Sequence, residues 1–134
     1  MADFPACIHR LHEGNIHEYF FTEISRHAVD QMFDIIESIL IEAAANNPAD
    51  QSNPTLINSS IGLQPLNHVF QRMPPIVKKY PAVQRAHIAI IVPPSPLLGT
   101  ISKILRTVTP IHFYKLHEYE RALAWLRSVS VSQD

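Results

Sequence analysis

The stretch HIAIIVPPSPLLGTISKIL, residues 87–105, decides the fold class. It begins with an unbroken apolar run from Ile88 to Val92. A strand with one face in water alternates apolar and polar residues, whereas a continuous run rich in β-branched residues needs cover on both faces. The run therefore predicts a central strand of a parallel α/β sheet. Pro93 and Pro94 end this strand, because proline cannot donate to a β ladder.

A helix follows this strand. Ser95 is suited to cap a helix, and Pro96 is suited to its first position. The apolar residues that follow recur at helical spacing, at Leu97, Leu98, Ile101, Ile104, Leu105 and Val108. The stretch therefore predicts a strand, a stiff turn and a helix.

The rest of the chain alternates in the same way. Working outward, we predict a hairpin of 6–12 and 16–21, a helix from Ser25 to about Ala45, a strand at 55–59, a kinked helix from Pro65 to Tyr80 across Pro74 and Pro75, a strand at 111–116 and a helix at 117–128. The order ββαβαβαβα predicts one α/β domain over 1–134, with a mostly parallel sheet and helices packed on it.

Composition excludes several classes of protein. The chain has 134 residues, of which 46% are hydrophobic and 17% charged, so it is globular rather than disordered. A net charge of −1 predicts no affinity for nucleic acid or an anionic membrane. No apolar run approaches the roughly 18 residues of a membrane span, and the first ten residues do not read as a signal peptide. We therefore expect a cytoplasmic protein.

Two stretches resemble STAS domains, the family of bacterial anti-sigma-factor antagonists. They are TLINSSIGL, residues 55–63, and IHFYKLHEYERALAWL, residues 111–126. In phosphorylated members a serine of the first stretch accepts phosphate from a partner kinase. The resemblance implies the same fold and a protein partner such as an anti-sigma factor or a kinase. The chain departs from the family's pattern at Asn58, where the antagonists usually carry Asp, and at Ile61, which lengthens the turn by one residue.

Candidate site residues lie where strands end. Ser59 and Ser60 are the candidate phosphoacceptor or anion site, because a helix start favours a negative group. The alternative is that one of them only caps the next helix. In open α/β sheets ligands gather beyond the carboxyl ends of the strands. We therefore expect a binding groove that also includes Asn58, Gly62, Ser95 and His117. The alternative is that such residues only cap their helices.

Metal and covalent chemistry find little support. The chain has 8 histidines, at positions 9, 12, 17, 27, 68, 87, 112 and 117, without the spacing of a zinc motif. We expect His9 to face His17 across the hairpin and His87 to lie beside His112, without a third ligand. Cys7 is the single cysteine, with nothing recognisable to activate it. We predict no catalytic residues, no metal and no cofactor.

The sequence therefore predicts a non-catalytic regulatory or protein-binding module of the STAS type, with a phosphoserine switch at Ser59 or Ser60. A homodimer is a further expectation, since Tyr119 or Trp125 would mark a dimer surface if exposed, and the alternative is that both pack in the core. Two alternatives stay open. One is a domain of the same fold that binds an apolar or anionic small molecule, and the other is an enzyme without a recognisable motif.

Overall fold

The computed structural model describes residues 5–46, 54–80, 86–105 and 111–131. The elements follow the predicted order ββαβαβαβα. They are β1 (Cys7–His12), β2 (Ile16–Phe21), α1 (Arg26–Asn46), β3 (Thr55–Asn58), α2 (Leu66–Lys79), β4 (Ile88–Ile91), α3 (Leu98–Leu105), β5 (Ile111–Tyr114), the 3₁₀ turn η2 (Leu116–Glu118) and α4 (Tyr119–Val131). The predicted fold class is therefore confirmed.

The five strands form one sheet in the order β1-β2-β3-β4-β5. β1 and β2 are antiparallel, and every later neighbour is parallel. The prediction that 88–92 forms the central strand is wrong, because β3 lies in the middle and β4 is second from the edge. An unbroken apolar run indicates that both faces of a strand are covered, but it does not indicate how many strands of the sheet lie to either side of that strand.

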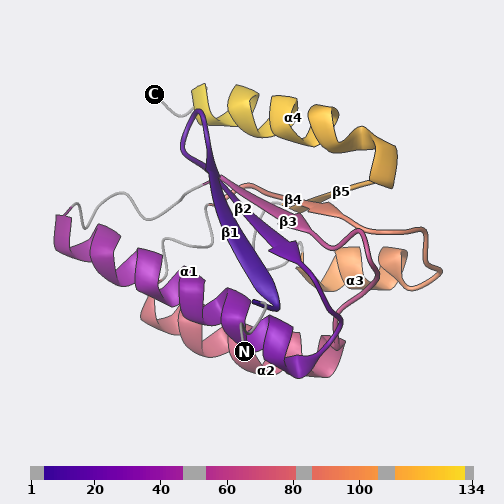
Figure 1. The fold of residues 1–134 in the computed structure, drawn as a ribbon, viewed down its shortest axis with the longest axis horizontal. Helices are drawn as coiled ribbons and strands as arrows, with labels where there is room; N and C mark the ends of the chain where they lie inside the picture. The colour runs from indigo at the N-terminus through magenta and orange to yellow at the C-terminus, as the bar shows by residue number, and fades with distance from the viewer. Residues whose placement is uncertain (1–4, 47–53, 81–85, 106–110, 132–134) are drawn as a thin grey trace.

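Helices cover both faces of the sheet (Figure 1). α4 lies on one face, where its Leu126 packs in a buried cluster with Ile16 of β2 and Ile91 of β4. α1, α2 and α3 lie on the other face (Figure 1). There Ile101 of α3 packs with Ile88 of β4. Alternate residues of one strand therefore enter two different cores, as the unbroken run of β4 requires.

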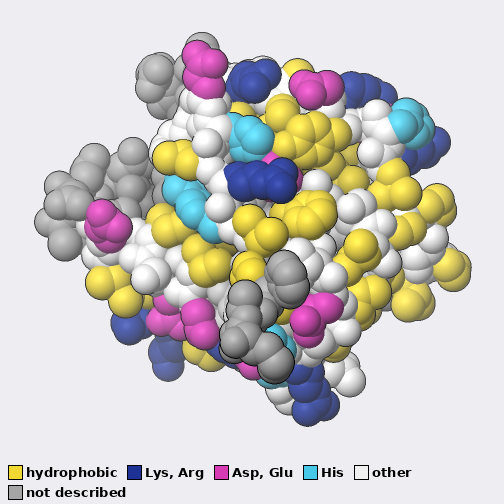
Figure 2. Space-filling model, in the orientation of Figure 1, with side chains coloured by type: hydrophobic (Ala, Val, Ile, Leu, Met, Phe, Trp, Pro, Cys, Tyr) yellow, Lys and Arg dark blue, Asp and Glu magenta, His cyan; other side chains and the backbone are white. Residues whose placement is uncertain are grey.

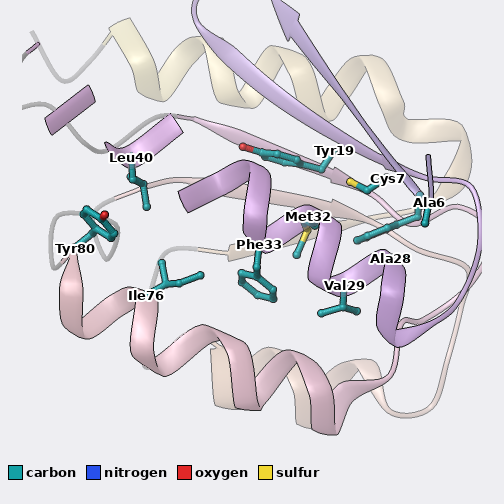
Figure 3. Close-up of a cluster of buried hydrophobic side chains, with 11 residues drawn as sticks. Ala6, Cys7, Tyr19, Ala28, Val29, Met32, Phe33, Leu40, Ile76 and Tyr80 are labelled. Carbon is teal, nitrogen blue, oxygen red and sulfur yellow. The ribbon is translucent and has the colours of Figure 1, made fainter. Parts of the chain in front are cut away.

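The larger core lies between α1 and the hairpin (Figure 3). Val29, Met32 and Phe33 of α1 pack in it with Cys7 and Tyr19 from the two hairpin strands. α1 begins as predicted, because the Ser25 hydroxyl accepts a hydrogen bond from the Ala28 N–H at 3.0 Å.

α2 is one helix across its two prolines. Pro74 and Pro75 lie inside the helical span 66–79, so the prediction of a single helix is confirmed. Its Ile76 packs into the core under α1 (Figure 3). Arg72 of α2 bonds Asp30 at 2.7 Å and Asp34 at 2.9 Å, and these ion pairs join α2 to α1.

The strands β2 to β5 all run the same way, so they end at one edge of the sheet, which we call the carboxyl edge. Four turns lie there. They are residues 22–25 after β2, 59–65 after β3, 92–97 after β4 and 115–118 after β5. The turn after β4 is therefore beside the turn after β3, as predicted.

Candidate functional site

Ser59 holds together the turn after β3. It is only 3% exposed, and its hydroxyl donates a hydrogen bond to the Gly62 carbonyl. Its own N–H bonds the Ile91 carbonyl of β4 at 2.9 Å, and the Gly62 N–H returns to the Ser59 carbonyl at 3.1 Å. The hydroxyl is thus buried and already bonded, which agrees with its alternative role of shaping the entry to α2.

Ser60 is more accessible than Ser59. It lies at the turn itself, partly exposed, and precedes Ile61, which is 46% exposed. Gly62 then has φ +143°, a backbone conformation that side chains disfavour. The α-carbon of Gly62 packs against Ile24 from the turn after β2, because a Cβ at position 62 would lie only 2.7 Å from Ile24 Cδ1. The turns after β2 and β3 are therefore in contact.

Ser95 and His117 occupy the next two turns. The Ser95 hydroxyl accepts a hydrogen bond from the Leu97 N–H at 3.2 Å, and its carbonyl accepts one from the Leu98 N–H. α3 begins at Leu98, so Pro96 belongs to the turn and not to the first helical position predicted for it. His117 is exposed within η2. Ser60, Ser95 and His117 thus follow three neighbouring strands along the carboxyl edge.

Large aliphatic side chains are exposed along the same edge. Seven large hydrophobic residues of the described chain are exposed, and four of them lie in the turns of the carboxyl edge. These four, the edge patch, are Ile24 (50%), Ile61 (46%), Leu97 (53%) and Leu116 (48%). Figure 2 shows hydrophobic side chains gathered on the side of the molecule where Figure 1 places the turn after β4. Sequence reasoning placed a groove here but missed these residues.

Asn58 turns inward, away from the patch. It is the last residue of β3, and its Nδ2 donates to Glu18 Oε2 at 3.1 Å on the face that α4 covers. Glu18 is a fully buried carboxylate in β2. Its Oε1 also lies 2.6 Å from the Tyr119 hydroxyl and 2.5 Å from His12 Nε2. This Glu18 cluster joins β1, β2, β3 and α4 and was not predicted.

Hydrogen bonding keeps Glu18 ionised. Burial alone would raise the pKa of Glu18, but hydrogen bonds from Tyr119, His12 and Asn58 outweigh it and lower the pKa below its usual value. In turn, burial and the carboxylate raise the pKa of Tyr119, which keeps its proton. The cluster is therefore a charged buried network that fastens α4 to the sheet. The buried Asn58 Oδ1 has no partner among the described residues.

His9 faces His17 across the hairpin, as the sequence predicted. His9 Nε2 is 2.9 Å from His17 Nδ1 across the hairpin. His87 and His112 both contact Trp125 of α4, with ring centroids at 5.6 and 4.1 Å. No group of three or more potential metal ligands occurs in the described residues. Burial raises the pKa of the Cys7 thiol to about 12, so Cys7 is an unreactive core residue.

Comparison of the chain with family models, curated proteins and solved structures finds no match. The resemblance to STAS domains therefore stays a prediction. The fold itself defines the class: an α/β protein with a mostly parallel five-stranded sheet between α4 and three other helices. In the part of the chain that the structure describes, no helix is long and apolar enough to cross a membrane.

Proposed function

We propose that this protein is a regulatory module that binds a partner protein through the edge patch. One observation carries the proposal: the four turns of the carboxyl edge each present an aliphatic side chain that is about half exposed, at Ile24, Ile61, Leu97 and Leu116. Isolated exposed hydrophobic residues are ordinary, but several on one edge are typical of an interaction site. The carboxyl edge is also where α/β folds place their binding sites.

Hydrogen bonds fix the shape of three of the turns that carry the edge patch. Ser59 fixes the turn of Ile61 through the Gly62 carbonyl, and the Ser95 hydroxyl fixes the N–H of Leu97. The N–H of Glu118 bonds the Lys115 carbonyl at 3.0 Å, and this bond closes the turn that holds Leu116. Side chains on turns of defined shape lose less entropy on binding, which favours docking of a protein.

A phosphoserine switch fits this surface at Ser60. The Ser59 hydroxyl is buried and donates to Gly62, whereas Ser60 is partly exposed beside Ile61. A phosphate on Ser60 would add a charge of about −1.5 to −2 next to an apolar patch and would disfavour an apolar partner. Ser60→Glu should therefore weaken partner binding and Ser60→Ala should retain it. Phosphosite mass spectrometry that never detects modified Ser60 in the native cell would count against the switch.

The test of the binding function compares two exposed residues of matched size. Leu97 is 53% exposed in the edge patch, and Ile41 is 54% exposed on α1, away from the carboxyl edge. Leu97→Glu and Ile41→Glu are each expressed with an affinity tag in the native cell, and bound proteins are quantified. We expect a specific partner of the unmodified chain to be lost from Leu97→Glu and kept by Ile41→Glu. Equal recovery on both variants would overturn the proposal.

A further inference from the structure

His9 and His17 of the hairpin form a contact that has room for only one proton between their two facing nitrogen atoms. His9 Nε2 and His17 Nδ1 lie 2.9 Å apart, which requires one N–H donor and one lone-pair acceptor. His17 is only 8% exposed, and the two rings lie 5.1 Å apart between centroids. If both rings were protonated, two N–H groups would face each other inside the protein, and this contact would become repulsive.

Among the residues that the structure describes, no carboxylate faces the pair to compensate the charge of two protonated rings. On the same face the neighbouring titratable residues are Cys7 and Tyr19, and burial raises the pKa of each. β3 contributes Thr55 opposite His17. Arg10 lies against the Phe20 ring, and Glu18 bonds Tyr119 of α4, so both belong to the other face.

α1, which packs on this face, brings no acid to the pair either. Asp30 and Asp34 bond Arg72 of α2, Glu37 lies 4.0 Å from that same arginine, and Glu42 is exposed. Two other histidines of the chain do face acids, His12 at Glu18 and His68 at Asp30. A proton on either of those histidines would face a carboxylate, whereas protons on both His9 and His17 would face each other.

We propose that the His9–His17 pair is an acid-sensitive latch, which releases the first residues of the edge strand β1, from Cys7 to His9, when both rings become protonated, while the contact of His12 with Glu18 holds the other end of the strand. β1 pairs with β2 on one side only, so it can open locally at lower cost than the whole domain. The pKa of His17 is lowered to about 4 by burial and by His9, and burial lowers the pKa of His9. Opening frees both rings to protonate near their usual pKa, so falling pH favours the open form.

Cys7 reports the opening directly. It lies in β1, two residues before His9, and is 3% exposed in the core under α1. The test measures the rate at which 4,4′-dithiodipyridine, a thiol reagent that reacts in acid, modifies Cys7 from pH 7.5 to pH 5. Each rate is divided by that of glutathione at the same pH. We expect the normalised rate to rise on the order of tenfold or more, because linkage shifts the opening equilibrium as the rings protonate. Circular dichroism should stay native throughout.

Three variants make the result decisive. His9→Gln and His17→Gln each leave one ring to protonate on opening, so each should reduce the pH-dependent rise, whatever its effect on the absolute rate. His117→Gln changes an exposed histidine of η2, which does not contact β1, and it should keep the full rise. Histidine imidazole NMR of the unmodified chain should show that His17 stays neutral until β1 opens. A rate independent of pH in the unmodified chain, or the same rise in both His9→Gln and His17→Gln, would overturn the proposal.

Discussion

The Tyr119 hydroxyl donates a hydrogen bond of 2.6 Å to Glu18 Oε1, which joins the first turn of α4 to the second strand of the sheet. The two residues are 101 positions apart in the chain. Glu18 is fully buried, so its charge depends on this donor and on His12 and Asn58. A buried carboxylate that loses a donor retains its desolvation cost without the compensating bond.

Tyr119→Phe should therefore lower the free energy of unfolding by about 2 kcal/mol, the usual scale for a hydrogen bond to a charged group. Tyr114→Phe is the matched control, because this tyrosine is also partly buried beneath α4 and its hydroxyl makes no hydrogen bond with any described residue. Urea denaturation of each variant and of the unmodified chain measures the loss of unfolding free energy. Losses of equal size would show that the Glu18 cluster does not fasten α4.

The Glu18 cluster also predicts how stability depends on pH. The folded pKa of Glu18 is lowered below 4.5, so the carboxylate stabilises the fold above that pH, and the contribution is lost as pH falls through the folded pKa. Between pH 5.5 and pH 3 the unmodified chain should therefore lose more unfolding free energy than Glu18→Gln, although Glu18→Gln starts lower. Parallel denaturation curves at each pH check this. A variant that loses as much as the unmodified chain would contradict the assignment.

Gly62 sets the backbone of the edge patch. At φ +143° a side chain is strained, so Gly62→Ala should destabilise the fold by about 1–3 kcal/mol. The added Cβ would also meet Ile24 Cδ1 at 2.7 Å, but that atom ends a flexible side chain and can move. Adding Ile24→Ala to Gly62→Ala should therefore recover little. Thermal denaturation of the single and double variants separates the two causes, and full recovery in the double variant would show that the clash dominates.

Sequence patterns were sufficient for the fold because they report local periodicity and burial. The hairpin, the alternation of strands and helices, and the cap at Ser25 all depend on residues within a few positions of each other. The position of β4 in the sheet was not accessible in this way. Strand order depends on which elements meet in space, and the apolar run of β4 is the same second from the edge as in the middle.

The candidate site was predicted in part. The carboxyl edge and its serines follow from where strands end, but exposure of Ile61 or Leu97 depends on how each turn folds. The Glu18 cluster was missed, although one local signal existed: Glu18 lies on the same strand face as Ile16, between apolar neighbours. A carboxylate at such a position must find donors. Its donors Asn58 and Tyr119 lie far along the chain, so spacing could not name them.

Site-specific photocrosslinking in the native cell tests the central claim, that the edge patch binds a partner protein. A benzophenone amino acid replaces Leu97 in one strain and Ile41 in another, two residues of nearly equal exposure at separate places in the fold. We predict a discrete crosslinked protein from position 97, lost when Leu116→Glu is added, and none from position 41. The same crosslinks from both positions, or none from position 97 under any growth condition, would contradict the account.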